Sequence, residues 1–71
     1  MEGIMEQLAI KRLKKGDFFT LKEIEDPKES QVWIKGEWDR SEHKYICTRF
    51  DDISQSRLIK ATKPVFVGFT F

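Results

Sequence analysis

The chain lacks the cysteines that could stabilise so small a domain through a disulfide or a metal site. Cys47 is the only cysteine and His43 the only histidine among 71 residues. An intrachain disulfide needs two cysteines, and a structural zinc site usually takes four Cys or His ligands. The sequence therefore excludes both devices, and we predict no metal and no cofactor.

Long apolar runs and an excess of one charge are also missing. No apolar stretch approaches the roughly 20 residues that span a bilayer. The N-terminus shows no basic region followed by an apolar run, so we expect no secretory signal and no membrane association. With 13 basic and 12 acidic residues the net charge is +1, which does not favour binding to nucleic acid through overall charge. We expect a cytoplasmic protein.

The richest β-forming stretch is residues 30–50, SQVWIKGEWDRSEHKYICTRF, which holds both tryptophans and the only tyrosine. Two runs of β-branched and aromatic residues around a polar break predict a hairpin. A four-residue turn over 40–43 pairs Asp39 with Lys44, whereas a five-residue turn shifts the second strand by one and swaps its faces. We take the four-residue turn. Gly36 in mid-strand indicates a bulge, a sharp bend or a close approach.

Residues 2–15, EGIMEQLAIKRLKK, are predicted to form an N-terminal helix. Apolar residues recur there at helical spacing: Met5, Leu8, Ala9 and Leu13. Acidic residues lie early and basic residues late, as the helix dipole favours, and Gly16 is a natural stop. Part of the stretch 10–13 could instead be extended, and the sequence leaves this open.

Residues 17–71 are interpreted as β structure. FFTLKEI after Gly16 predicts a first strand, residues 57–60 a short strand, and VFVGFTF over 65–71 the last one. Residues 51–56 are interpreted as a polar connection containing one helical turn. The fold class is therefore mainly β with one N-terminal helix, in a single domain over 1–71. About five short antiparallel strands form a strongly curled sheet or a small SH3-like or OB-like barrel.

The core is predicted from the apolar faces of the helix and the strands. Its expected members are Leu8, Phe19, Leu21, Val32, Ile34, Trp38, Tyr45, Val65, Val67 and Phe69. Cys47 lies between Ile46 and Thr48 in a strand, so we expect a small buried hydrophobe rather than a nucleophile.

The segments LKKGDFF, VWIKGEWDRSEHKYIC and KPVFVGFTF together resemble a family of small uncharacterised proteins from Bacteroides-type gut bacteria. The likeness covers about residues 12–71. It implies a compact β-rich domain and brings no catalytic or binding residue to this chain.

No catalytic motif is present. His43 falls in the predicted turn, where a solvated side chain lacks the fixed geometry that a general base needs. Asp51 and Asp52 are expected to cap or solvate a turn, because the spacing of a calcium loop is absent. The four glycines are scattered, which excludes a glycine-rich phosphate loop. We predict that the protein is not an enzyme.

The first functional hypothesis is a non-catalytic interaction module that works through a sheet face or a sheet edge. In the chosen register several large apolar residues fall on the less buried face of the sheet, more than a soluble monomer normally exposes. This candidate interaction face consists of Trp33, Ile46, Phe50 and Phe66. It predicts a homodimer or another protein partner, centred on Trp33 and Phe66, as an alternative to a monomer covered by the helix.

The second hypothesis is a small nucleic-acid-binding β-barrel, which we favour less. A basic cluster near the helix end and basic residues in the strands would contact phosphates, while strand aromatics stack on bases. The candidate contacts are Lys11, Arg12, Lys14, Lys15, Lys35, Arg49, Arg57 and Lys60. For the cluster near the helix end, the favoured explanation is a solvated helix end supported by the dipole.

Overall fold

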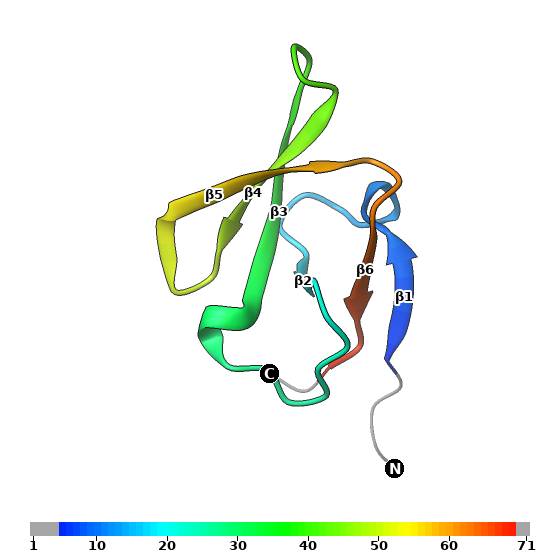
Figure 1. The fold of residues 1–71 in the computed structure, drawn as a ribbon, viewed down its shortest axis with the longest axis vertical. Helices are drawn as coiled ribbons and strands as arrows, with labels where there is room; N and C mark the ends of the chain where they lie inside the picture. Colours follow the sequence, from blue (N-terminus) through cyan, green and yellow to red (C-terminus); the bar gives the residue numbers. More distant parts are fainter. Residues whose placement is uncertain (1–4, 70–71) are drawn as a thin grey trace.

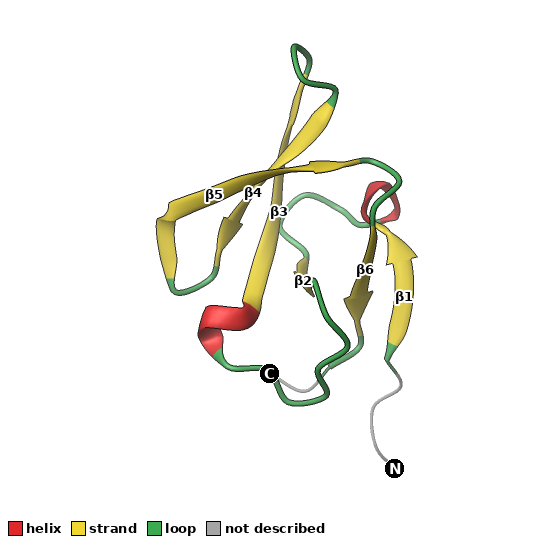
Figure 2. Cartoon of the chain, viewed as in Figure 1, coloured by secondary structure: helices red, strands yellow, loops and turns green. Residues whose placement is uncertain are grey.

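The computed structural model describes residues 5–69 as one six-stranded antiparallel sheet, in the order β1-β6-β2-β3-β4-β5 (Figures 1 and 2). Its elements are β1 (Glu6–Ala9), the 3-10 turn η1 (Ile10–Arg12), β2 (Phe18–Thr20), the 3-10 turn η2 (Glu29–Gln31), β3 (Val32–Asp39), β4 (Lys44–Arg49), β5 (Asp52–Lys60) and β6 (Pro64–Val67). The prediction of a mainly β domain is correct, but the described residues form six strands rather than about five.

The predicted N-terminal helix is wrong over the described part of 2–15, and residues 2–4 lie outside the described residues. Glu6–Ala9 form strand β1, in which Leu8 pairs with Val65 of β6. A short helix is marginal on its own, whereas β6 offers backbone groups that need partners, so tertiary pairing outweighs the helical spacing. Ile10–Arg12 are neither α-helical nor extended but form η1. Over residues 5–69 no helix has the length and apolar character to cross a membrane.

The sheet curls strongly but does not close, so of the two predicted arrangements, a curled sheet and a small barrel, the barrel is wrong. β1 and β5 are its two edges and are not hydrogen-bonded to each other. Two main-chain bonds nevertheless tie η1 to the β5–β6 turn, from the Ile10 N–H to the Lys63 carbonyl (3.0 Å) and from the Lys11 N–H to the Ala61 carbonyl (3.1 Å). The curl therefore brings η1 beside the turn that follows β5 (Figure 1).

The β3–β4 hairpin begins as predicted. Asp39 lies opposite Lys44 and Trp38 opposite Tyr45. The Asp39 carbonyl accepts a hydrogen bond from the His43 N–H at 2.8 Å, and His43 has a positive φ of 57°. Closing a turn with one left-handed residue is a common solution for a hairpin loop of this length. The four-residue turn is confirmed.

A bulge at Gly36 then changes the register. The register that continues from Asp39 and Lys44 would place Gly36 opposite Cys47, but Lys35 lies there instead. β3 therefore contains one residue more than β4 between this pair and Trp38. Of the bulge, sharp bend or close approach that Gly36 indicated, the structure shows the bulge, but its effect on side-chain direction was not predicted. Residues of β3 before the bulge point to the opposite face from the one predicted, and Trp33 is among them.

The core lies on the inner, concave face of the sheet. Its buried residues are Ile10, Leu13, Phe19, Cys47, Ile59 and Val65, with Leu8, Leu21, Trp33, Tyr45 and Val67 packed against them. Six of the ten predicted core residues belong to this cluster. Val32, also predicted, is fully buried but lies outside it, on the outer face beside Thr20.

Trp38 is not a core residue, although the sequence predicts that it belongs to the core. Its side chain is 41% exposed. Its indole packs edge-on against the ring of Tyr45, with the ring centroids 4.8 Å apart. Trp38 lies beyond the bulge, where the hairpin extends past the rest of the sheet (Figure 1). Ile34 and Phe69, two other predicted core residues, are half-buried.

Lys35 is an unusual member of the interior, because it is only 5% exposed. Its ammonium group donates a hydrogen bond to the Leu13 carbonyl and lies over the ring of Tyr45, 4.1 Å from the centroid. Its own main chain bonds to Gly16 and Asp17, at 2.8 and 3.0 Å. A buried cation is tolerated only when its hydrogen bonds are satisfied. Because these partners belong to the N-terminal segment, Lys35 joins that segment to the hairpin.

Candidate binding surface along strand β5

Strand β5 is the longest strand and forms one edge of the sheet. It covers nine residues, Asp52–Lys60, and pairs only with β4 within the described part of the chain. Residues 53–58 are all exposed, including Ile53 at 79% and Leu58 at 41%. The predicted polar connection over 51–56 is therefore wrong from Asp52 onward. Its polar composition concealed a strand, because an exposed edge strand does not need apolar side chains.

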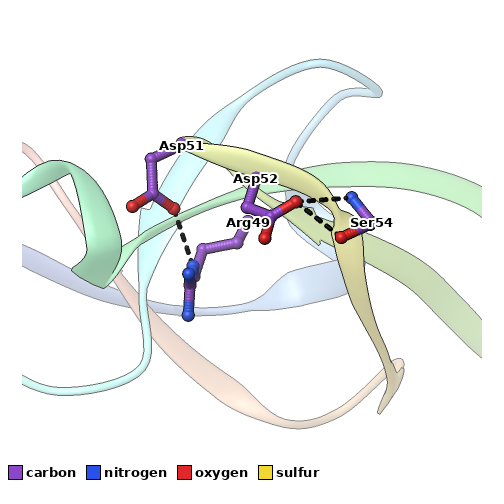
Figure 3. Close-up of polar contacts among 4 residues, drawn as sticks. All are labelled: Arg49, Asp51, Asp52 and Ser54. Carbon is purple, nitrogen blue, oxygen red and sulfur yellow. Dashed lines mark hydrogen bonds and ion pairs between the residues drawn. The ribbon is translucent and has the colours of Figure 1, made fainter.

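The start of β5 is bent. The pairing register shifts at Arg49, which lies opposite Asp52. The Asp52 carboxylate accepts hydrogen bonds from the Ser54 hydroxyl (2.6 Å) and the Ser54 N–H (3.1 Å), while Arg49 pairs with Asp51 at 2.7 Å (Figure 3). The bonds from Ser54, the hydroxyl first, lower the pKa of Asp52 below its ordinary value. The bend leaves residues 56–60 as the regularly paired part of the edge strand.

A groove lies beside β5 where it meets the β5–β6 turn. Its lining residues are Leu21, Lys44, Arg57, Leu58, Ile59, Lys60, Thr62, Lys63 and Pro64. Four of them are basic, and none is acidic or aromatic. We call this the basic groove.

The basic groove brings like charges close together. Lys44 and Lys60 lie directly opposite each other on β4 and β5. Like charges at directly opposed positions destabilise a sheet, so this arrangement lowers the stability of the unbound protein. Within residues 5–69 the two ion pairs are Lys15–Glu37 and Arg49–Asp51, and neither involves the groove. Arg57 instead lies 5.6 Å from the centre of the Trp33 ring.

The predicted nucleic-acid contacts are only partly gathered. Arg57 and Lys60 line the groove, and Lys11 is tied beside it through Ala61. Lys35 is buried, and Lys15 and Arg49 are engaged in ion pairs. Arg12 and Lys14 are exposed in the segment around η1. Sequence reasoning missed Lys44 and Lys63, which become neighbours of Lys60 only through the sheet pairing and the turn.

The candidate interaction face is divided by the bulge. Ile46, Phe50 and Phe66 are half-buried on the outer face, but Trp33 lies on the inner face opposite Phe19. The structure therefore does not bring Trp33 and Phe66 together on one face. Phe18 joins the outer group instead, with its ring 5.3 Å from that of Phe50.

The chemistry-bearing side chains do not form a cluster. His43 is exposed in the hairpin turn, with its ring 6.4 Å from that of Trp38. Cys47 is fully buried, as predicted, and burial raises the pKa of its thiol above the ordinary value. Among residues 5–69 no three His, Cys, Asp or Glu side chains are placed to hold a metal ion.

Cys47 is expected to resist a thiol reagent in the native protein. It is fully buried, and its raised pKa leaves little of the reactive thiolate at neutral pH. Labelling followed by mass spectrometry should be slow in buffer and rapid in urea. A matched control, Ser41→Cys with Cys47→Ala, places the thiol in the exposed turn and should react at once. Rapid stoichiometric labelling of native wild type would contradict the burial.

Comparison with known proteins gives no relative: no family model, no curated protein and no solved structure matches this chain. The resemblance to small proteins of Bacteroides-type gut bacteria stays an expectation.

Proposed function

We propose that this domain is a non-catalytic protein-interaction module that pairs an extended segment of a partner with the free edge of β5. The observation that carries the proposal is the edge strand β5, which is exposed throughout residues 53–58 and regularly paired with β4 over 56–60. Unpaired N–H and C=O groups along such an edge are a template for another strand. Strand addition of this kind is a recurring mode of peptide recognition.

The contrast between the two edges supports the proposal. β1 has four residues, and a very short edge strand is one way in which proteins prevent edge pairing. β5 is more than twice as long and contains no proline. Its Leu58 lies opposite Ile46, so the edge continues into the apolar outer face. A bound strand would therefore find both main-chain partners and apolar side chains there.

Selection from a displayed library of random peptides as long as β5 tests this proposal. Enriched peptides are expected to slow hydrogen exchange of main-chain amides within 53–59, because pairing removes them from water. Ile53→Lys with Leu58→Lys should weaken binding roughly tenfold or more, since it removes two apolar side chains and protects the edge with charge. The matched control, Gln7→Lys on edge strand β1, should bind as wild type does.

Two results would contradict strand addition at β5. One is a selection that enriches no peptide, and the other is protection of amides outside β5.

A second copy of the chain is the form of partner that the homodimer hypothesis requires. Sedimentation at several concentrations distinguishes this case, because the Ile53→Lys, Leu58→Lys variant should then be monomeric where wild type associates.

A further inference from the structure

The basic groove lies against the proposed pairing edge and carries charge that the fold does not neutralise. Lys44, Arg57, Lys60 and Lys63 line it, without an acidic residue. Neither ion pair of the described residues reaches it. Exposed like charges are ordinarily spread apart, because their repulsion costs stability. An anionic ligand would remove this repulsion, so the groove is complementary to negative charge.

The uncharged part of the lining indicates what else the ligand carries. Leu21, Leu58, Ile59 and Pro64 contribute apolar surface between the basic side chains. Small apolar recesses beside an edge strand are where alternate side chains of an added strand are recognised. A ligand that alternates charged and apolar groups therefore fits this surface better than a uniformly charged one.

The lining also distinguishes between two kinds of polyanion. Proteins that hold single-stranded nucleic acid stack bases on aromatic side chains along a basic groove. None of the residues lining the basic groove is aromatic. Trp33, whose ring lies under Arg57, packs against the core, and Trp38 packs edge-on against Tyr45. The groove itself thus offers charge and an edge strand, but no aromatic side chain on which a base could stack.

We propose that the β5 edge and the basic groove bind an extended acidic peptide, with its carboxylates facing Lys44, Lys60 and Lys63 and an apolar side chain over Leu21 and Pro64. This inference rests on the proposed strand addition and names the chemistry of its partner. Surface charge pairs contribute little individually but together steer association and select among partners.

The test uses fluorescein-labelled peptides as long as β5 and fluorescence anisotropy at about 50 and 500 mM salt. The acidic probe alternates glutamate and valine, and matched probes replace glutamate by threonine or by lysine. A fourth probe keeps the glutamates but has proline in place of the central valines, so that it cannot pair as a strand. An oligothymidylate is the nucleic-acid probe. We expect the acidic peptide to bind about tenfold more tightly than the threonine peptide at low salt, and the lysine peptide not to bind.

Variants locate the binding site. Lys60→Glu with Lys63→Glu should weaken the acidic peptide about tenfold or more, whereas Lys22→Glu with Lys28→Glu makes the same charge change on exposed loop residues outside the groove and should have little effect. Lys60→Gln with Lys63→Gln, a milder change, should weaken binding severalfold, and circular dichroism shows that each variant is folded.

Each other outcome overturns a defined part of the inference. Equal binding of the acidic and threonine peptides would contradict the preference for an acidic partner but would not contradict strand addition. Equal binding of the acidic and proline peptides removes strand addition and leaves only a charged groove. Tighter binding of oligothymidylate than of the acidic peptide favours a nucleic-acid ligand, and no binding of any probe removes the proposal altogether.

Discussion

Phe19→Ala is expected to destabilise the protein by about 3–5 kcal/mol, the usual cost of removing a fully buried phenylalanine. Phe19 is completely buried at the centre of the core cluster, on β2 between β3 and β6. At about 0.05–0.15 kcal/mol per residue, a domain of this size is stable by roughly 4–11 kcal/mol. The substitution therefore removes a large part of the total, and much of the protein should be unfolded at 37 °C.

Trp38→Ala is the matched control, because it removes a larger ring from a site that is 41% exposed. Its cost should be about 1–2 kcal/mol, mainly the edge-on contact with Tyr45. Urea unfolding followed by circular dichroism measures both variants on the same scale. The placement of the core would be contradicted if Trp38→Ala were the more damaging substitution.

Gly36→Ala is expected to destabilise by about 2–3 kcal/mol, and to lower the melting temperature by roughly 10–20 °C. A Cβ at this position would overlap the main-chain carbonyl of Ile46 on the neighbouring strand. A carbonyl in a sheet ladder cannot move aside as a flexible side chain can. The bulge must therefore open, and the pairing of Lys35 with Cys47 is disturbed with it.

Gly16→Ala is the control that measures the cost of backbone strain at a glycine position without a steric clash. Gly16 has a φ of +95°, which is unfavourable for alanine, but nothing lies within 4 Å of an added Cβ. Strain alone costs about 1–2 kcal/mol and is partly offset by the less flexible unfolded chain. Thermal melts should place the Gly36 variant clearly below the Gly16 variant. A Gly36→Ala protein that melts within about 3 °C of wild type would exclude the close approach.

The hairpin was predictable because its signals are local. Asp39 and Lys44 pair across a turn whose residues are close in sequence, and Gly36 marks the bulge by its composition alone. The face on which Trp33 lies was not predictable, because it depends on how many residues the bulge inserts. One inserted residue moves Trp33 from the predicted outer face to the core.

The strand predicted over 57–60 is part of β5, whereas β1 and the first half of β5 were missed for different physical reasons. Glu6–Ala9 has helical apolar spacing, and only a partner from the far end of the chain makes it a strand. Residues 52–56 are polar because an exposed edge buries little, so their sequence shows no alternation to detect. The basic groove was equally hidden, since Lys44, Lys60 and Lys63 meet through strand pairing and a turn. Only Arg57 and Lys60 among its cations were singled out from the sequence.

The pairing of β1 with β6 has a consequence for the order in which the chain folds. Glu6 lies opposite Val67, so these strands close the longest loop in the described chain. Such closure is entropically costly and slows folding, because local contacts must form first. During folding the hairpin can assemble before β6 has docked, but β1 then has no partner. During that interval β1 and the β6-facing edge of β2 are open to strands of neighbouring chains, and aggregation should begin there rather than at β5.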